Sequence, residues 1–177
     1  MVEITVRQQD KAALAASQPP RQYLTFTLRG EMYAVETLSV KEIIEYGPPT
    51  VVPMMPPSVR GVINLRGAAV PVFDLGIRFG TGPTEAQRRS CIVIVESTEG
   101  AGEDGTGGHV FGLIVDAVSA VLEIAAADIE PPPAFGARIR SDFIAGMGKV
   151  EGRFVILLEI GRVLSADELA AMPAVAV

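Results

Sequence analysis

The chain has 177 residues, of which 49% are hydrophobic, so it is long enough for one domain or two small ones with a substantial core. Its net charge of −6 argues against a nucleic-acid-binding protein, because phosphate contacts require a clustered basic surface. A single cysteine excludes an intrachain disulfide, and a single histidine excludes a multi-histidine metal site.

The same composition bears on membranes and on the kind of partner. No apolar run approaches the roughly 20 residues of a membrane-spanning helix. Residues 1–4 also lack the basic and apolar pattern with which a secretory signal peptide begins. Aromatic residues make up only 6% of the chain, so stacking platforms for single-stranded nucleic acid are not expected. We therefore expect a cytoplasmic protein without direct membrane insertion, whose partners are other proteins.

The N-terminal part of the chain is predicted to hold a leader and a hairpin. Residues 1–20 are rich in alanine and end in two prolines, which is typical of a loose, flexible leader. Apolar residues alternate with threonine over 24–28, and Arg29-Gly30 then indicates a turn into a second strand at 32–35. Residues 36–46 fit the spacing of a helix and that of a strand, so both remain open.

The next part contains the most informative run of the sequence. Five prolines between residues 48 and 57 exclude a regular helix there. The run 59–75 then predicts two short strands around a turn, which contains Arg66 and is framed by Gly61 and Gly67.

The second half of the chain again has the pattern of strands. Residues 91–95 and 109–115 are predicted strands, and the glycine-rich, acidic stretch 96–108 is the long loop between them. Cys91 begins an apolar run and is expected to be a buried strand residue. Farther on, Ser165 and Glu168 have the spacing of a capping box, which predicts a short C-terminal helix over 165–172.

An internal repeat organises these elements. Residues 33–53 match residues 111–131 at an offset of 78, and residues 61–75 match residues 146–160 at an offset of 85, so one seven-residue insertion reconciles the two. The repeat predicts an all-β fold of two small modules of about five strands each, packed together as barrels. The first barrel is expected at about 21–85 and the second at about 86–165.

Catalytic chemistry finds little support in the sequence. His109 is the only histidine, and it lies beside a glycine-rich stretch that lacks the Lys-Ser/Thr of a phosphate-binding loop. Asp74, Asp116 and Glu159 each end or follow an apolar strand, where a turn carboxylate is ordinary. A hydrolase would require these carboxylates to converge in one pocket, and we interpret them as structural.

The strongest resemblance is carried by Gly61-Val62-Ile63-Asn64-Leu65-Arg66-Gly67, followed by Val70-Pro71-Val72 and Asp74-Leu75. These motifs, with Tyr33-Ala34-Val35 before them and Gly112-Leu113 after them, resemble the CheW-type coupling proteins of bacterial chemotaxis. The resemblance covers roughly residues 21–172.

Family membership of this kind implies a fold and a function. The fold would be two SH3-like five-stranded β-barrels side by side, with short helical segments, and the exchange of strands between the barrels stays open. The function would be a non-enzymatic scaffold without cofactors, recruited to the inner membrane face through receptors. Its partners would be the cytoplasmic tip of a chemoreceptor, the regulatory domain of a CheA-type histidine kinase and further CheW-like copies in an array. The alternative is an SH3-like or oligonucleotide-barrel-like binding module outside chemotaxis.

The resemblance also implies a partner-binding surface. Glu42 and Arg66 would form an ion pair beside it, and Arg66 is the residue on which recognition should depend most. Where many family members have arginine after the Asp-Leu pair, this chain has Gly76, so a contact made from that position is not carried over. The expected partner-binding residues are Val40, Glu42, Ile43, Gly61, Asn64, Leu65, Arg66 and Gly67.

Overall fold

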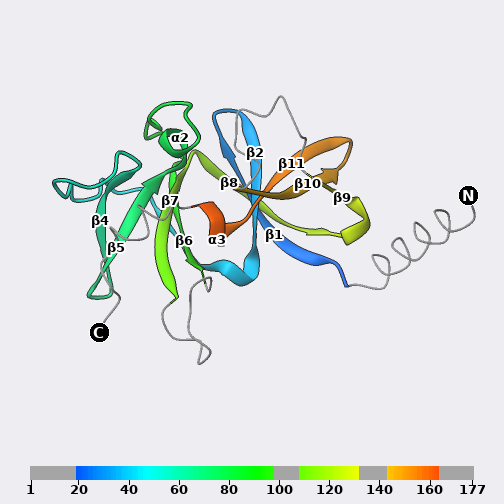
Figure 1. The fold of residues 1–177 in the computed structure, drawn as a ribbon, viewed down its shortest axis with the longest axis horizontal. Coiled ribbons are helices and arrows are strands. Elements are labelled where there is room, and N and C mark those ends of the chain that lie inside the picture. The colour runs from blue at the N-terminus through cyan, green and yellow to red at the C-terminus, as the bar shows by residue number, and fades with distance from the viewer. Residues whose placement is uncertain (1–18, 98–107, 132–142, 164–177) are drawn as a thin grey trace, which may run out of the picture.

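The computed structural model describes residues 19–97, 108–131 and 143–163, and in these ranges the chain is built mainly of β-strands (Figure 1). The all-β prediction is thereby confirmed. The strands are β1 (Arg21–Leu28), β2 (Glu31–Glu36), β3 (Val40–Glu45), β4 (Val59–Leu65), β5 (Ala68–Asp74), β6 (Cys91–Ser97), β7 (His109–Val115), β8 (Ala117–Ile124), β9 (Ile129–Glu130), β10 (Ile144–Val150) and β11 (Arg153–Leu158).

In the described part of the chain, three short helical segments lie between strands, namely η1 (Thr37–Ser39), α2 (Leu75–Arg78) and η2 (Ala126–Asp128), and α3 (Ile160–Val163) follows β11. Within the described ranges, no helix has the length and apolar character required to cross a membrane. Most of the predicted leader 1–20, the loop 96–108 and the C-terminal helix 165–172 lie outside the described residues.

Two sequence interpretations were settled at the level of single elements. The segment 36–46, for which helix and strand both remained open, is a short 3₁₀ turn followed by strand β3, whose side chains alternate between half-buried and exposed. Cys91 was expected to be buried, yet it is only half-buried, because it is the first residue of β6 and lies at the end of the sheet.

The strands form two sheets that have the same internal order. One sheet runs β8-β1-β2-β11-β10-β9 and the other runs β3-β6-β7-β5-β4. The sequence repeat aligns β2 with β7, β3 with β8, β4 with β10 and β5 with β11, so each strand of the five-stranded sheet has its equivalent at the same place in the other sheet. The sixth strand, β9, has only an isolated bridge between Thr50 and Val62 as its counterpart.

Neither sheet coincides with one half of the chain. The sequence had left open whether strands are exchanged between the repeats. The β1–β2 hairpin belongs to the first repeat but pairs with β8 and β11 of the second repeat. In the same way, the β6–β7 hairpin of the second repeat lies between β3 and β5 of the first. The two repeats have therefore exchanged their first hairpins, which a repeat in the sequence alone does not reveal.

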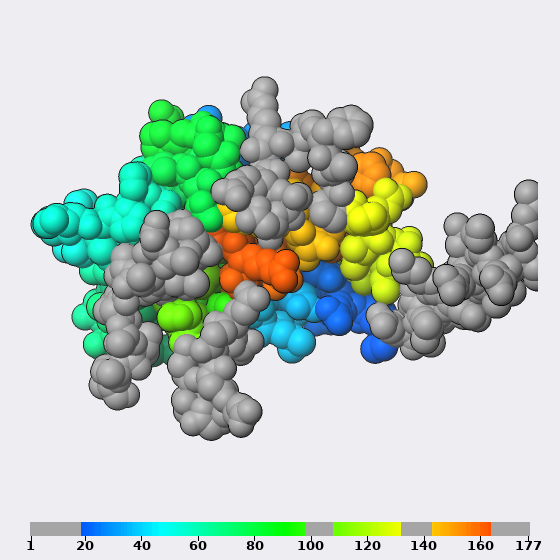
Figure 2. All heavy atoms as spheres, in the orientation of Figure 1, coloured from blue at the N-terminus to red at the C-terminus, as the bar shows by residue number. Residues whose placement is uncertain are grey.

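The largest hydrophobic cluster lies between the two sheets. It contains Phe26 and Tyr33 from the six-stranded sheet and Phe73 and Phe111 from the five-stranded sheet. The rings of Phe73 and Phe111 meet edge to face at 5.6 Å between centroids, an arrangement that aromatic quadrupoles favour. Two smaller clusters each lie within one sheet, around Ala34 and Leu157 and around Val72 and Ile94. Because the shared cluster draws on both sheets, the two repeats fold as one elongated body (Figure 2).

Candidate functional site

The turn between β4 and β5 holds most of the predicted site residues. Arg66 (φ 54°) and Gly67 (φ 88°) both have positive φ, which is the conformation that a two-residue type I′ hairpin turn requires at its two central positions. The Asn64 side-chain oxygen accepts a hydrogen bond of 2.8 Å from the Gly67 amide and so closes the turn. This geometry leaves the Arg66 side chain 83% exposed. Asn64 and Gly67 thus build the turn, and Arg66 is the residue that the turn presents.

An ion pair connects this turn to the other edge of the same sheet. The Arg66 Nη2 atom lies 3.3 Å from the Glu42 Oε2 atom on β3, as the resemblance implied. Since β3 and β4 are the two outermost strands of the five-stranded sheet, the sheet is curved enough to bring its margins together. The pair is solvent-exposed and should contribute less than about 1 kcal/mol to stability. It orients Arg66 rather than holding the fold together.

A groove of about 490 Å³ opens beside the ion pair. Apolar side chains from β4, β5 and β7 line it, and charged side chains of β3 and of the turn stand beside them. Leu65 packs with one face against the hydrophobic cluster inside the sheet, so the groove has a fixed apolar wall. Its lining residues are Lys41, Glu42, Leu65, Arg66, Ala68, Ala69, Val70 and Val110.

Five predicted site residues do not line this groove. Two of them, Asn64 and Gly67, build the turn, and the other three are Val40, Ile43 and Gly61. Val40 is half-buried and packs against the cluster between the sheets, whereas Ile43 is 43% exposed on β3. Gly61 is buried, and a Cβ atom at this position would overlap the carbonyl oxygen of Thr50. Gly61 is therefore needed for the close approach of the preceding segment to β4.

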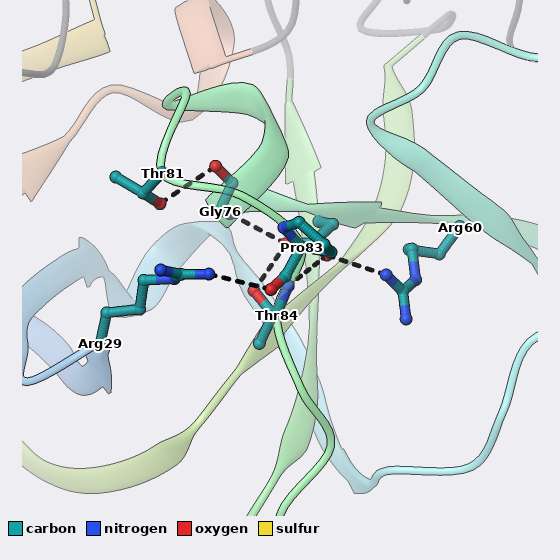
Figure 3. A network of polar contacts seen from close by, with 7 residues as sticks. Arg29, Arg60, Gly76, Thr81, Pro83 and Thr84 are labelled. Atoms are coloured by element: carbon teal, nitrogen blue, oxygen red, sulfur yellow. Dashed lines mark hydrogen bonds and ion pairs between the residues drawn. The ribbon is translucent and has the colours of Figure 1, made fainter.

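A second polar cluster surrounds the carboxylate of Asp74, and the sequence did not predict how many groups hydrogen-bond to it. The Asp74 carboxylate is fully buried and accepts hydrogen bonds from the Gly76 amide (2.9 Å), the Thr84 amide (2.8 Å) and the Thr84 hydroxyl (2.6 Å). The Arg60 guanidinium approaches the same carboxylate at 3.3 Å from the neighbouring strand (Figure 3). Sequence reasoning correctly interpreted Asp74 as structural. It missed Arg60 and Thr84, because their proximity depends on the path of the loop.

This carboxylate fixes the segment 75–84, which we call the clasp loop, at the end of β5 through Gly76 and Thr84, and other residues of the loop contact the other sheet. Arg29 of the six-stranded sheet donates a hydrogen bond of 3.0 Å to the Pro83 carbonyl (Figure 3). Phe79 stacks between Tyr33 and Phe143, with ring centroids 5.8 Å and 6.1 Å away. Arg78 donates to the Val163 carbonyl at 2.8 Å. The clasp loop thus fixes how the two sheets are placed relative to each other.

The carboxylates that a hydrolase would need have separate environments. Asp116 accepts a hydrogen bond of 2.8 Å from the Arg29 amide, and Glu159 is exposed next to α3. Neither contacts the enclosed carboxylate of Asp74, whose hydrogen-bond partners lie in or beside the clasp loop. Across the described part of the chain, no three or more His, Cys, Asp or Glu side chains are grouped so that they could hold a metal ion.

Comparison with known proteins adds independent information. Residues 22–168 match the family model of the CheW-like domain. The chain is 32% identical over 163 residues to the chemotaxis protein CheW of Klebsiella aerogenes, covering 92% of this chain and 93% of the relative. It is also 32% identical to the chemotaxis protein CheW of Rhizobium meliloti, over 84% of this chain and 90% of the relative. Among solved structures, the scaffolding protein TtCheW of Thermoanaerobacter tengcongensis is similar, with a TM-score of 0.73, 32% identity and coverage of 86% and 93% of the two chains.

Proposed function

Because this chain belongs to the CheW-like domain family, we propose that it is a chemotaxis adaptor that couples a chemoreceptor to a CheA-type histidine kinase. Relatives that match over most of their length are named as chemotaxis proteins, and the similar solved structure is described as a scaffolding protein. The role is that of a non-enzymatic scaffold which acts at the cytoplasmic face of the membrane through its receptor.

The observation that carries this proposal is the exposed Arg66 beside an apolar groove. A protein docking site typically combines a desolvated apolar centre with charged groups that fix orientation, and arginine is enriched at the residues that dominate binding energy. The groove supplies the apolar centre through Leu65 and Val70, and Arg66 with Glu42 supplies the charged margin. A carboxylate of the partner can pair with the guanidinium through two parallel hydrogen bonds.

The predicted site residues then divide into two roles. Glu42, Leu65 and Arg66 contact the partner, and exposed Ile43 extends the surface along β3. Residues of the second group shape the surface from beneath, through core packing, close backbone approach and the turn. This second group comprises Val40, Gly61, Asn64 and Gly67.

The test is the charge reversal Arg66→Glu. The turn should tolerate glutamate, because Glu151 occupies the equivalent position in the other repeat with the same positive φ. We expect the variant to keep the thermal midpoint of the native protein and to bind the kinase regulatory domain or the receptor tip about tenfold more weakly or worse. Isothermal titration calorimetry with each purified partner measures this.

The matched control is Lys149→Glu, which makes the same change of charge on an exposed residue of β10, in the other sheet. It should leave both affinities unchanged. Native affinity of Arg66→Glu for both partners, with native folding, would remove the groove from the proposed docking surface.

A further inference from the structure

The two repeats differ at the residue that can pair with the carboxylate at the end of their last strand. In the first repeat, Arg60 lies at the register shift near the start of β4, and its guanidinium is 3.3 Å from the Asp74 carboxylate (Figure 3). In the second repeat, Ala145 lies at the same register shift in β10, and the carboxylate belongs to Glu159. The amides of Asp74 and Glu159 donate to equivalent carbonyls, so the local backbone geometry is the same. The second repeat therefore keeps the carboxylate but lacks the cation that pairs with it.

A cavity of about 380 Å³ lies between these two residues of the second repeat. Ala145 and Glu159 both line it, so its position corresponds to that of the Arg60 side chain in the first repeat. Ile124 and Leu157 also line it, and they are buried members of the hydrophobic cluster within the six-stranded sheet. The cavity thus has a fixed apolar wall with a carboxylate at its margin.

The charges around the cavity leave one carboxylate in excess. Arg21 lines the cavity too, but its Nη1 atom is engaged by the Glu36 Oε1 atom at 3.1 Å. Within the described ranges, the Glu159 carboxylate forms no ion pair. Burial raises the pKa of Tyr23, which lines the same cavity, and the carboxylates of Glu36 and Glu159 act in the same direction. The electrostatics of the cavity therefore favour a bound cation.

We infer that this cavity binds a small organic cation, a guanidinium or primary ammonium group on a short apolar chain. The cation pairs with Glu159 as Arg60 pairs with Asp74, and the apolar chain covers the apolar wall of the cavity. An exposed ion pair contributes little, so apolar contact supplies most of the affinity, and the Kd is on the order of 1 mM. This inference goes beyond the adaptor role and does not depend on it.

Titration of the full-length, ¹⁵N-labelled chain with n-butylguanidinium, followed by amide chemical shifts, tests the inference. We expect saturable shifts at Ile124, Ile129 and Ala145, which line the cavity. The uncharged compound n-butylurea has nearly the same shape, and it should bind about fivefold more weakly, because it cannot form the ion pair. Absence of saturable shifts at these amides with n-butylguanidinium at about 20 mM, well above the expected Kd, would overturn the inference.

The variant Glu159→Gln tests the role of the carboxylate. It removes the charge and keeps the shape of the side chain, so the variant should bind n-butylguanidinium and n-butylurea with equal affinity. The matched control is Glu123→Gln, which removes the charge of an exposed carboxylate on β8 that does not line the cavity. The control should keep the native preference for the cation. A preference that persists unchanged in Glu159→Gln would contradict the proposed ion pair.

The variant Ala145→Arg tests the comparison between the repeats. It supplies from within the chain the guanidinium that Arg60 provides in the first repeat, so it should occupy the cavity and abolish the saturable shifts. Ala127→Arg adds the same group at an exposed residue of η2 that does not line the cavity, and it should bind n-butylguanidinium as the native chain does. Native affinity of Ala145→Arg, with native circular dichroism, would refute the inference.

Discussion

At the scale of single residues, equivalent positions of the two repeats have taken different roles. Asp74 is the last residue of β5 and Glu159 directly follows β11, the equivalent strand, and their amides donate hydrogen bonds to the equivalent carbonyls of Ser58 and Phe143. Only the shorter side chain of Asp74 is fully buried, where it caps α2 and holds the clasp loop. The sequence placed both carboxylates at strand ends, but it did not distinguish them, because burial depends on the loop that folds over one of them.

Replacing Asp74 by alanine should therefore cost much more stability than the same change at Glu159. Asp74→Ala leaves the Thr84 amide and the half-buried Arg60 guanidinium without their acceptor, which should lower the free energy of unfolding by about 3 kcal/mol. Exposed Glu159→Ala should change it by less than about 0.5 kcal/mol. Urea unfolding measures both, and equal losses would show that the buried cluster does not stabilise the fold.

At the scale of elements, the strands could be predicted from the alternation of apolar and polar residues, and the turns could be predicted from the positions of glycine. The run 59–75 was predicted as two strands around a turn, and the structure has β4 and β5 there with Arg66-Gly67 between them. Gly61 could be recognised from the sequence as part of the motif, yet the reason why this position requires glycine lies in a different element. The segment around Thr50 pairs with Val62 and passes so close to Gly61 that no side chain fits.

Gly61→Ala should accordingly separate the proline-rich segment from β4. The added Cβ atom overlaps the Thr50 carbonyl, so the Thr50–Val62 hydrogen bonds of 2.9 Å must break or the backbone must shift, at a cost of about 2 kcal/mol or more. Gly47→Ala is the control, because its Cβ atom meets nothing within 4 Å. Chemical denaturation, with amide exchange at Val62 as a local probe, measures the difference. Equal stabilities of the two variants would contradict the steric argument.

At the scale of the whole molecule, one aromatic cluster packs between the two sheets and joins them. Tyr33 lies in this cluster, stacked on Phe26 at 6.0 Å and on Phe79 at 5.8 Å. Burial, where a phenolate is poorly solvated, and to a smaller extent the nearby Glu31 carboxylate together raise the pKa of Tyr33 to about 12. The neutral ring is thus part of what holds the sheets together.

The stability of the fold should therefore decline at alkaline pH in part because Tyr33 loses its proton, and Tyr33→Phe should remove that part of the decline. Tyrosine in the unfolded chain loses its proton near pH 10, but Tyr33 in the folded chain does so only near pH 12. The folded state then binds the extra proton, so this contribution is complete below pH 10 and is lost as the pH rises towards 12. Tyr33→Phe should show a shallower fall of the thermal midpoint over this interval. Parallel curves for the two proteins would contradict the assignment to Tyr33.

The sequence by itself determined the all-β class, the internal repeat, the family and the turn that presents Arg66, because alternation, glycine positions and motif spacing are local properties of the chain. The tertiary structure decided the exchange of the first hairpins between the repeats, the curvature by which the two margins of one sheet meet at the Glu42–Arg66 pair, and the burial of Asp74 beneath the clasp loop. These features join residues that are distant in the chain. They depend on which strands pair along their edges. The alternation of apolar and polar residues with a period of two specifies which face of a strand is buried, but not which strand lies beside it.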